Sequence, residues 1–117
     1  PGFWSRDSGL TAPLRMDTPT DIARAHRMRA ALGLEGGQLV ANPIPEADEI
    51  PRAVLAPVIE QALSEAAAQG ISAKAVTPFL LQRVFDLTQG RSLSANIALV
   101  RNNARLGARI ARALQQG

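Results

Sequence analysis

The sequence contains no cysteine and no tyrosine, and it has only one tryptophan, one histidine and one lysine. The absence of cysteine excludes disulfides, thiolate metal sites and cysteine nucleophiles. Because aromatic residues make up 3% of the 117 residues, aliphatic side chains and alanine must fill any core. Twelve arginines accompany the single Lys74, and acidic residues are interspersed among them. A nucleic-acid-binding protein typically clusters its basic residues and offers aromatic side chains for stacking, so we expect no nucleic-acid partner.

Long apolar runs are also missing. No run approaches the roughly 20 residues that span a bilayer, and the first residues, "PGFWSRDSGL", lack the layout of a signal peptide. We therefore expect no membrane association and a cytoplasmic location. The length suits one small domain, and a content of 46% hydrophobic and 20% charged residues is typical of a packed globule.

Capping residues predict four helices separated by loops. Their start and stop signals are Thr18–Pro19 to Gly33, Pro51 or Pro57 to Gly70, Thr77–Pro78 to Gly90, and Ser92 onward. In the last helix one apolar stripe is expected to face the core, and it consists of Ile97, Val100, Ala104, Ala108, Ala111 and Leu114. Four arginines on the opposite stripe are expected to be solvated, namely Arg101, Arg105, Arg109 and Arg112.

Two short segments are predicted as strands. Leu39–Ala41 is an apolar run after two glycines and indicates a buried strand that ends at Asn42, and residues 71–76, "ISAKAV", indicate a second. The predicted fold class is therefore α/β, mostly helical with one or two short buried strands. A buried strand needs neighbours on both edges and helices on both faces, so the chain is expected to lack structural partners.

Catalytic and metal-binding patterns are weak. The single His26 has no second imidazole nearby in the sequence, which favours a surface or packing role. Glu46, Asp48 and Glu49 could hold a cation, but acidic residues before a helix are favoured by its dipole in any case. Nothing around Lys74 supplies the neighbours of a Schiff-base nucleophile. We therefore predict neither a catalytic residue nor a metal ligand in this chain.

Three asparagines in the last predicted helix need an explanation, because asparagine is a mediocre helix former. For Asn102 and Asn103 we expect hydrogen bonds that hold a neighbouring loop. Asn96 is expected in the first helical turn, where a carboxamide offers one acceptor and two donors to an amide or imide edge. On chemistry alone, a ligand contact and a structural role remain equally open for Asn96.

The asparagine helix is one of several stretches that carry a family resemblance. "GFWSRDSGL", "LRMDTP", "ALGLEGGQLVANPIPE", "IEQALSEAAAQGI", "KAVTPFLLQRVFDLTQGRSL" and "NIALVRNNARLGARIA" occur in order over nearly the whole chain. Together they resemble the C-terminal part of the pseudouridine-5′-phosphate glycosidases, a group also called indigoidine synthase A-like. "VANPIPE", "TPFLL" and "NIALVRNNA" are distinctive in combination.

The resemblance implies a C–C glycosidase that reversibly splits pseudouridine 5′-phosphate into uracil and ribose 5-phosphate. In that family a lysine attacks the anomeric carbon and forms an imine, a glutamate handles the proton, and a divalent cation, typically manganese, lies on an aspartate. The family has an α/β/α fold and assembles as homotrimers. This chain resembles only about the last third, so the lysine, glutamate, aspartate and main phosphate contacts would precede it, in an N-terminal catalytic portion absent from residues 1–117.

The residue that carries over is Asn96, at the position of a family asparagine near the uracil. Ser8, Asn42 and Thr77 lie in family-like motifs at loop or helix-start positions and are weaker substrate-binding candidates. We expect the chain alone to be inactive. Two alternatives stay open, a truncated non-enzymatic helical module that binds a partner subunit, and a C-glycosidase that acts on another nucleobase.

Overall fold

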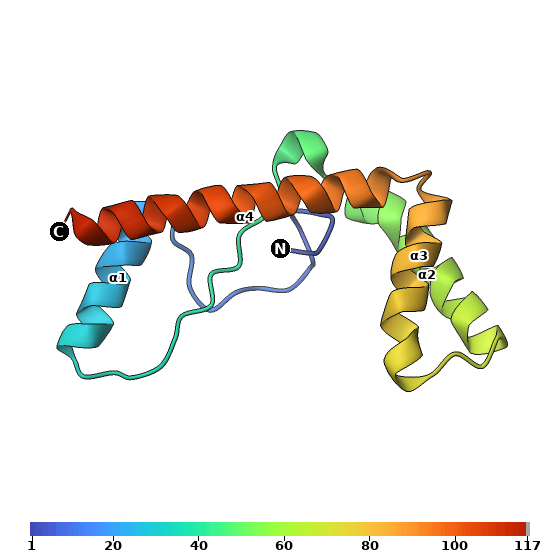
Figure 1. The fold of residues 1–117 in the computed structure, drawn as a ribbon, viewed down its shortest axis with the longest axis horizontal. Helices are drawn as coiled ribbons and strands as arrows, with labels where there is room; N and C mark the ends of the chain where they lie inside the picture. Colours follow the sequence, from blue (N-terminus) through green and yellow to red (C-terminus); the bar gives the residue numbers. More distant parts are fainter. Residues whose placement is uncertain (117) are drawn as a thin grey trace.

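The computed structural model describes residues 1–116, and every regular element in them is helical. The elements are α1 (Pro19–Ala31), η1 (Glu46–Asp48), α2 (Arg52–Ala68), η2 (Ala73–Ala75), α3 (Val76–Leu87) and α4 (Arg91–Gln115), where η denotes a 3₁₀ helix. Figure 1 shows α4 along the length of the molecule, with α1 at its C-terminal end and the α2–α3 pair at its N-terminal end. The molecule measures 53 × 30 × 21 Å and is therefore elongated.

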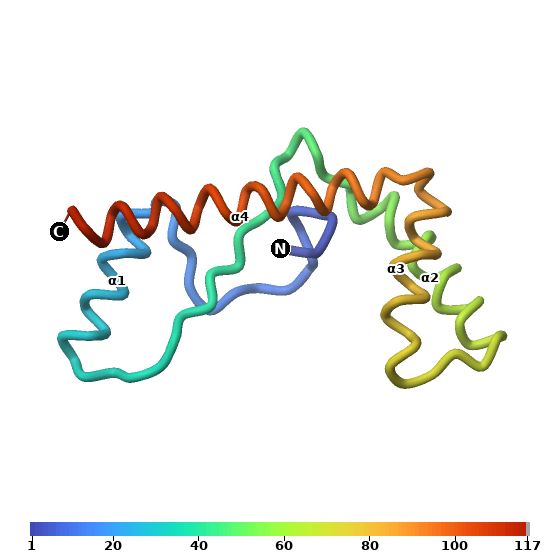
Figure 2. The backbone as a smooth tube through the Cα atoms, in the orientation of Figure 1, coloured from blue at the N-terminus to red at the C-terminus, as the bar shows by residue number. Residues whose placement is uncertain are grey.

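The predicted α/β class is wrong for the part of the chain that the structure describes. Leu39–Ala41 is not a strand, and Leu39 is 97% exposed. A strand needs a neighbour to pair its backbone N–H and C=O groups, and no segment of residues 1–116 runs beside this one as a strand. Figure 2 shows it as part of a long extended connection from α1 back towards α4.

The second predicted strand, residues 71–76, is also wrong. It contains the short 3₁₀ helix Ala73–Ala75, which leads directly into α3. Alanine and lysine are depleted in strands, so this stretch has little intrinsic preference for the extended form.

Within residues 1–116 no helix combines the length and the apolar character that crossing a membrane requires.

Helix α1 forms as its capping residues predict. The Thr18 hydroxyl accepts a hydrogen bond from the Asp21 N–H at 3.1 Å, and Pro19 occupies the first helical position. At the other end Gly33 has φ +68°, and the Leu34 N–H donates to the Arg29 carbonyl at 3.0 Å. A glycine in this left-handed conformation with that hydrogen bond is a Schellman motif, so the predicted start and stop are confirmed.

Helix α2 contains Pro57 in its interior, although proline removes a backbone donor there. The helix begins at Arg52 rather than at Pro57, and Gly70 ends it with φ +66°.

The Glu65 carboxylate of α2 accepts hydrogen bonds from Arg83 of α3, the one from Arg83 Nη2 at 2.9 Å. These hydrogen bonds, together with one from Gln61, lower the pKa of Glu65 below its ordinary value.

The predicted N-caps of the last two helices are wrong. Helix α3 begins at Val76, so Thr77 is its second residue and does not cap it. Helix α4 begins at Arg91 after Gly90, and Ser92 lies inside the helix, 4% exposed. The N-cap position is Gly90, which has no side chain, and the Ser92 N–H is instead satisfied by Thr88, whose hydroxyl accepts from it at 3.1 Å and donates to the Val84 carbonyl at 2.7 Å. One side chain thus joins the end of α3 to the start of α4.

The main core lies between the α2–α3 pair, the start of α4 and the connection before α2. Its buried members are Ile44, Ile50, Leu55, Ala62, Val84 and Ala95. Trp4 packs against this cluster and donates from Nε1 to the Ser92 carbonyl at 3.0 Å, while its own carbonyl accepts from the Ile50 N–H at 2.8 Å. The N-terminal segment is therefore fastened both to the start of α4 and to the loop before α2.

The face of α4 that packs differs from the predicted one. Ile97 is 46% and Val100 58% exposed, and Ala104, Ala108 and Ala111 are exposed as well. The apolar residues that are buried or half-buried are instead Ala95, Ala98, Leu99, Leu106, Ile110 and Ala113, with Leu114 also half-buried. The arginines at 101, 105, 109 and 112 are exposed, as predicted. The helix thus has two apolar faces. One packs within residues 1–116, and the other, which the sequence pattern predicted to be buried, is exposed.

The α3–α4 turn generates the first prediction. Gly90 has φ +82°, and a Cβ there would lie 3.4 Å from the Phe85 ring. Replacing Gly90 by alanine should lower the free energy of unfolding by about 1–2 kcal/mol, the cost of a left-handed conformation with a side chain. The matched control is Gly107→Ala, in α4 with no atom within 4 Å of the new Cβ. It should raise stability by about 0.5–1 kcal/mol.

Urea denaturation followed by circular dichroism measures both changes. The same substitution should therefore have opposite signs at the two positions, and a stabilising Gly90→Ala would contradict the turn geometry.

Candidate functional site

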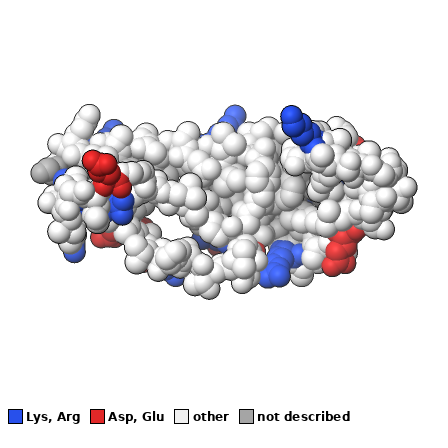
Figure 3. All heavy atoms as spheres, turned by 90° about the horizontal axis from the view of Figure 1, so that it is seen from below, with Lys and Arg blue, Asp and Glu red and all other residues white. Residues whose placement is uncertain are grey.

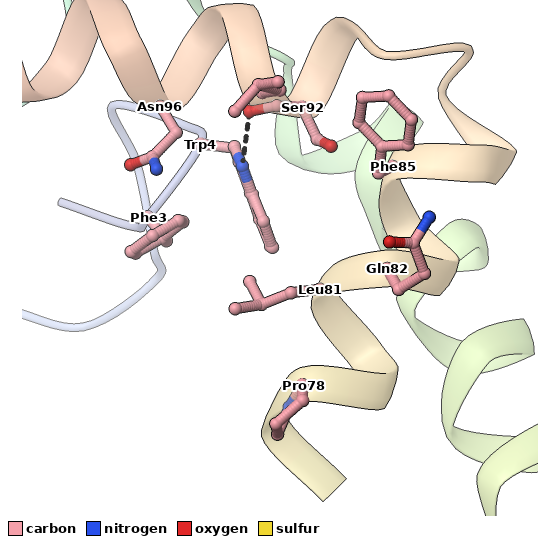
Figure 4. Close-up of a pocket in the computed structure, with 9 residues that line it drawn as sticks. Phe3, Trp4, Pro78, Leu81, Gln82, Phe85, Ser92 and Asn96 are labelled. Atoms are coloured by element: carbon pink, nitrogen blue, oxygen red, sulfur yellow. Dashed lines mark hydrogen bonds between the residues drawn. The ribbon is translucent and has the colours of Figure 1, made fainter.

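A cavity of about 440 Å³ lies at the N-terminal end of α4. It is lined by Phe3, Trp4, Pro78, Leu81, Gln82, Phe85, Ser92, Leu93 and Asn96. Figure 4 shows that these residues come from three places, the N-terminal segment, α3 and the first two turns of α4. The walls are mostly aromatic and aliphatic, with a few polar groups, as is typical of small-molecule sites.

A hydrogen bond from the Trp4 indole orients the aromatic wall. Trp4 Nε1 donates to the Ser92 carbonyl at 3.0 Å, and the Phe3 ring meets the Trp4 ring edge to face with 4.7 Å between centroids. Phe3 remains 50% exposed, so its ring offers a free apolar surface beside the cavity. Phe3 and Trp4 were not predicted as site residues, although they are two of only four aromatic residues in the chain.

Asn96 is the predicted substrate-binding residue that the structure places in this cavity. It is half-buried, and Figure 4 shows its carboxamide on the same side of α4 as Phe3 and Trp4. The predicted cap at Ser92 had placed Asn96 in the first helical turn. Because α4 begins at Arg91, Asn96 is instead its sixth residue and lies in the second turn. Within residues 1–116 its side chain makes no hydrogen bond. Its donors and acceptor are therefore available to a ligand.

The weaker candidates lie elsewhere. Ser8 lines a second cavity of about 350 Å³ on α2, and its hydroxyl accepts from the Leu10 N–H at 3.3 Å. Asn42 lines a third, of about 740 Å³, between the N-terminal segment and the connection before α2. Thr77 is exposed on α3 beside Pro78. The structure does not bring these three residues together with Asn96.

The other two helix asparagines hold the connection before α2, as predicted. Asn102 Nδ2 donates to the Pro43 carbonyl at 3.0 Å, and Asn103 Oδ1 accepts from Asn42 Nδ2 at 3.1 Å. Both bonds join α4 to a segment about 60 residues away in the sequence. Asn42 therefore has a structural partner that its loop position did not reveal.

The remaining polar candidates do not form a site. His26 is exposed, with Nδ1 3.0 Å from Gln38 Oε1, and Lys74 is exposed. Glu49 accepts from the Arg6 N–H at 2.9 Å. In the described residues no group of three or more histidine, aspartate or glutamate side chains is placed to hold a metal ion. On the face in Figure 3 the charged side chains are scattered over a largely uncharged surface.

Comparisons with known proteins identify relatives over nearly the whole chain. The model of the family "Indigoidine synthase A like protein" matches residues 1–113. The chain is 74% identical over 114 residues to the pseudouridine-5′-phosphate glycosidase of Paracoccus denitrificans (strain Pd 1222), and 70% identical over 114 residues to that of Jannaschia sp. (strain CCS1). Each match covers 97% of this chain but only 38% of the relative, in the relative's C-terminal part.

A solved structure has the same fold over this region. It is the prealnumycin C-glycosynthase AlnA in complex with ribulose 5-phosphate, with a TM-score of 0.83 and 27% sequence identity. The match covers 94% of this chain and 36% of AlnA. From the family model and these relatives, the chain belongs to the indigoidine synthase A-like family and corresponds to the C-terminal part of its pseudouridine-5′-phosphate glycosidases.

Proposed function

We propose that this chain supplies the base-binding segment of a C–C glycosidase that reversibly cleaves pseudouridine 5′-phosphate to uracil and ribose 5-phosphate. The observation that carries the proposal is the 74% identity to a pseudouridine-5′-phosphate glycosidase over 97% of the chain. AlnA, a C-glycosynthase by name, adds support, since its structure holds a sugar phosphate. Both point to chemistry at a carbon–carbon bond between a ring and a pentose phosphate.

In this proposal the Asn96 carboxamide binds the imide edge of the uracil through hydrogen bonds. The imide edge of uracil presents a ring N–H between two carbonyl groups, and a carboxamide can accept from the N–H and donate to a carbonyl at the same time. The apolar walls formed by Phe3, Leu81 and Phe85 suit a flat ring.

The catalytic groups are assigned outside this chain. The proposal places the imine-forming lysine, the acid–base glutamate and the main phosphate contacts in the N-terminal portion that the relatives carry. The residues of this chain do not fit a divalent cation, since the described part of the chain has no suitable acidic or histidine cluster. Manganese, which the resemblance implies, is therefore assigned no ligand in this chain. Assembly as homotrimers is an expectation from the same resemblance, and a cytoplasmic location is an expectation from the sequence composition.

Because the proposal assigns the catalytic groups to the N-terminal portion, the chain alone should be inactive. Release of uracil from pseudouridine 5′-phosphate should be undetectable with the 117-residue chain. It should appear when the chain is joined to the N-terminal portion of the Paracoccus denitrificans relative, in place of that enzyme's own C-terminal part. Uracil release by the short chain would contradict the proposal. An inactive but folded fusion would instead favour the non-enzymatic module that binds a partner subunit.

The role of Asn96 predicts a loss of base discrimination. In the active fusion, Asn96→Ala should lower kcat/KM for uracil in the reverse reaction by about 10- to 100-fold, because two hydrogen bonds are lost. With 3-methyluracil, which lacks the imide N–H, the variant and the unaltered fusion should differ much less. The matched control is Asn103→Ala on the same helix, which should leave the ratio between the two bases unchanged. Equal losses with both bases for Asn96→Ala would show that its role is structural.

A further inference from the structure

Ser92 lines the cavity at the N-terminal end of α4, although it is only 4% exposed. In the part of the chain that the structure describes, Ser5 and Ser92 are the two buried polar residues. The Ser5 hydroxyl donates to the Asp7 carbonyl at 2.8 Å, whereas the Ser92 hydroxyl makes no hydrogen bond within residues 1–116. Buried hydroxyls normally have a partner, so the one on Ser92 needs an explanation.

The Ser92 hydroxyl reaches the cavity. Among the described residues, no fully buried side-chain oxygen or nitrogen lacks a hydrogen-bond partner. Because the Ser92 hydroxyl has no partner, the small exposed part of this residue includes its hydroxyl oxygen. In the view of Figure 4 this oxygen lies between the Trp4 and Phe85 rings, which both line the cavity.

The backbone of Ser92 is held by two side chains from outside α4. Its N–H donates to the Thr88 hydroxyl at 3.1 Å, and its carbonyl accepts from Trp4 Nε1 at 3.0 Å. Thr88 ends α3, and Trp4 belongs to the N-terminal segment. The residue is therefore fixed before a ligand arrives, which lowers the entropy that binding to its hydroxyl would cost.

Ser92 and Asn96 are placed to bind the same ligand. They are four residues apart on α4, so they lie on one side of the helix with about 5–6 Å between their Cβ atoms. Both line the same cavity. In the proposed function the Asn96 carboxamide binds the ring N–H and one carbonyl of uracil. A hydroxyl one helical turn away can donate to the other carbonyl.

We propose that the Ser92 hydroxyl is a second base-binding group, which donates a hydrogen bond to the uracil carbonyl that Asn96 leaves free. Together the two side chains would bind the whole imide edge, carbonyl, N–H and carbonyl. The proposal rests on the proposed function, which supplies the base. A structural role has less support, because Ser92 lies inside α4 rather than at its N-cap and alanine is the better helix former there.

Kinetics of the fusion to the N-terminal portion of the Paracoccus denitrificans relative test this role. In the reverse reaction with ribose 5-phosphate, Ser92→Ala should raise the KM for uracil about tenfold, with a much smaller change in kcat, because one hydrogen bond to the base is lost. The matched control is Ser94→Ala, the same change at an exposed position of α4, which should leave the KM unchanged.

Thio-substituted bases identify the carbonyl that Ser92 binds, because sulfur is a weak hydrogen-bond acceptor. In calorimetric titrations of the fusion, Ser92→Ala should lose little affinity for one of the two bases 2-thiouracil and 4-thiouracil, and more for the other. Asn96→Ala should show its smaller loss with the opposite base. The same preference in both variants, or an unchanged affinity of Ser92→Ala for uracil, overturns the proposal.

The stability of the 117-residue chain separates a ligand contact from a structural contact without any activity. Ser92→Ala should leave the urea midpoint unchanged or raise it, because the hydroxyl that is removed has no partner in the chain. A fall in the midpoint beyond that of Ser94→Ala shows that the hydroxyl stabilises the fold, and overturns the proposal.

Activity and binding also separate this proposal from the proposed function. An active fusion whose KM for uracil is the same in Ser92→Ala overturns the role of Ser92 and leaves the glycosidase function intact. An inactive fusion that binds uracil, with an affinity that falls in Ser92→Ala, overturns the function and supports the role of Ser92. A fusion that neither binds uracil nor forms product overturns both.

Discussion

The structure depends on one helix that has to organise every other element. Helix α4 contacts α1 near one end and α3 near the other, and the asparagines at 102 and 103 hold the connection before α2 against its middle. The groups at its two ends lie too far apart to form one common core, as the 53 Å length of the molecule shows. Stability in such an arrangement is local to each end, so the continuity of α4 fixes the position of one end relative to the other.

The same helix explains where the candidate site lies. The cavity forms where α4 starts, because the Thr88 hydroxyl ties that start to α3 and Trp4 ties it to the N-terminal segment. Asn96 lies one helical turn beyond Ser92, between the packed face of α4 and the face that carries the exposed Ile97 and Val100. A ligand bound there would therefore touch the N-terminal segment, α3 and α4 together.

The sequence predicted the parts of this structure that local chemistry decides. Thr18, Pro19 and Gly33 define α1 through backbone hydrogen bonds within a few residues, and the distinctive motifs identified the family. Predictions from the sequence failed where a segment's conformation or burial depends on contacts with other segments. Leu39–Ala41 has the composition of a buried strand but no neighbour to pair with, and Ile97 and Val100 have the spacing of a core face but no partner in these residues. Ser92 looked like an N-cap because serine caps helices well, yet the Thr88 hydroxyl already meets that need. Asn96 could be placed in a cavity only once the N-terminal aromatics were seen beside it.

The central claim is that α4 is an extended scaffold whose second apolar face is uncovered in this chain. Small-angle X-ray scattering of the 117-residue chain at several concentrations tests it most directly, because it measures overall dimensions without any substitution. The account predicts a monomer with a radius of gyration close to the 17.7 Å of the structure. A value near the ~13 Å of a compact globule, or near the ~35 Å of an unfolded chain of this length, would contradict it.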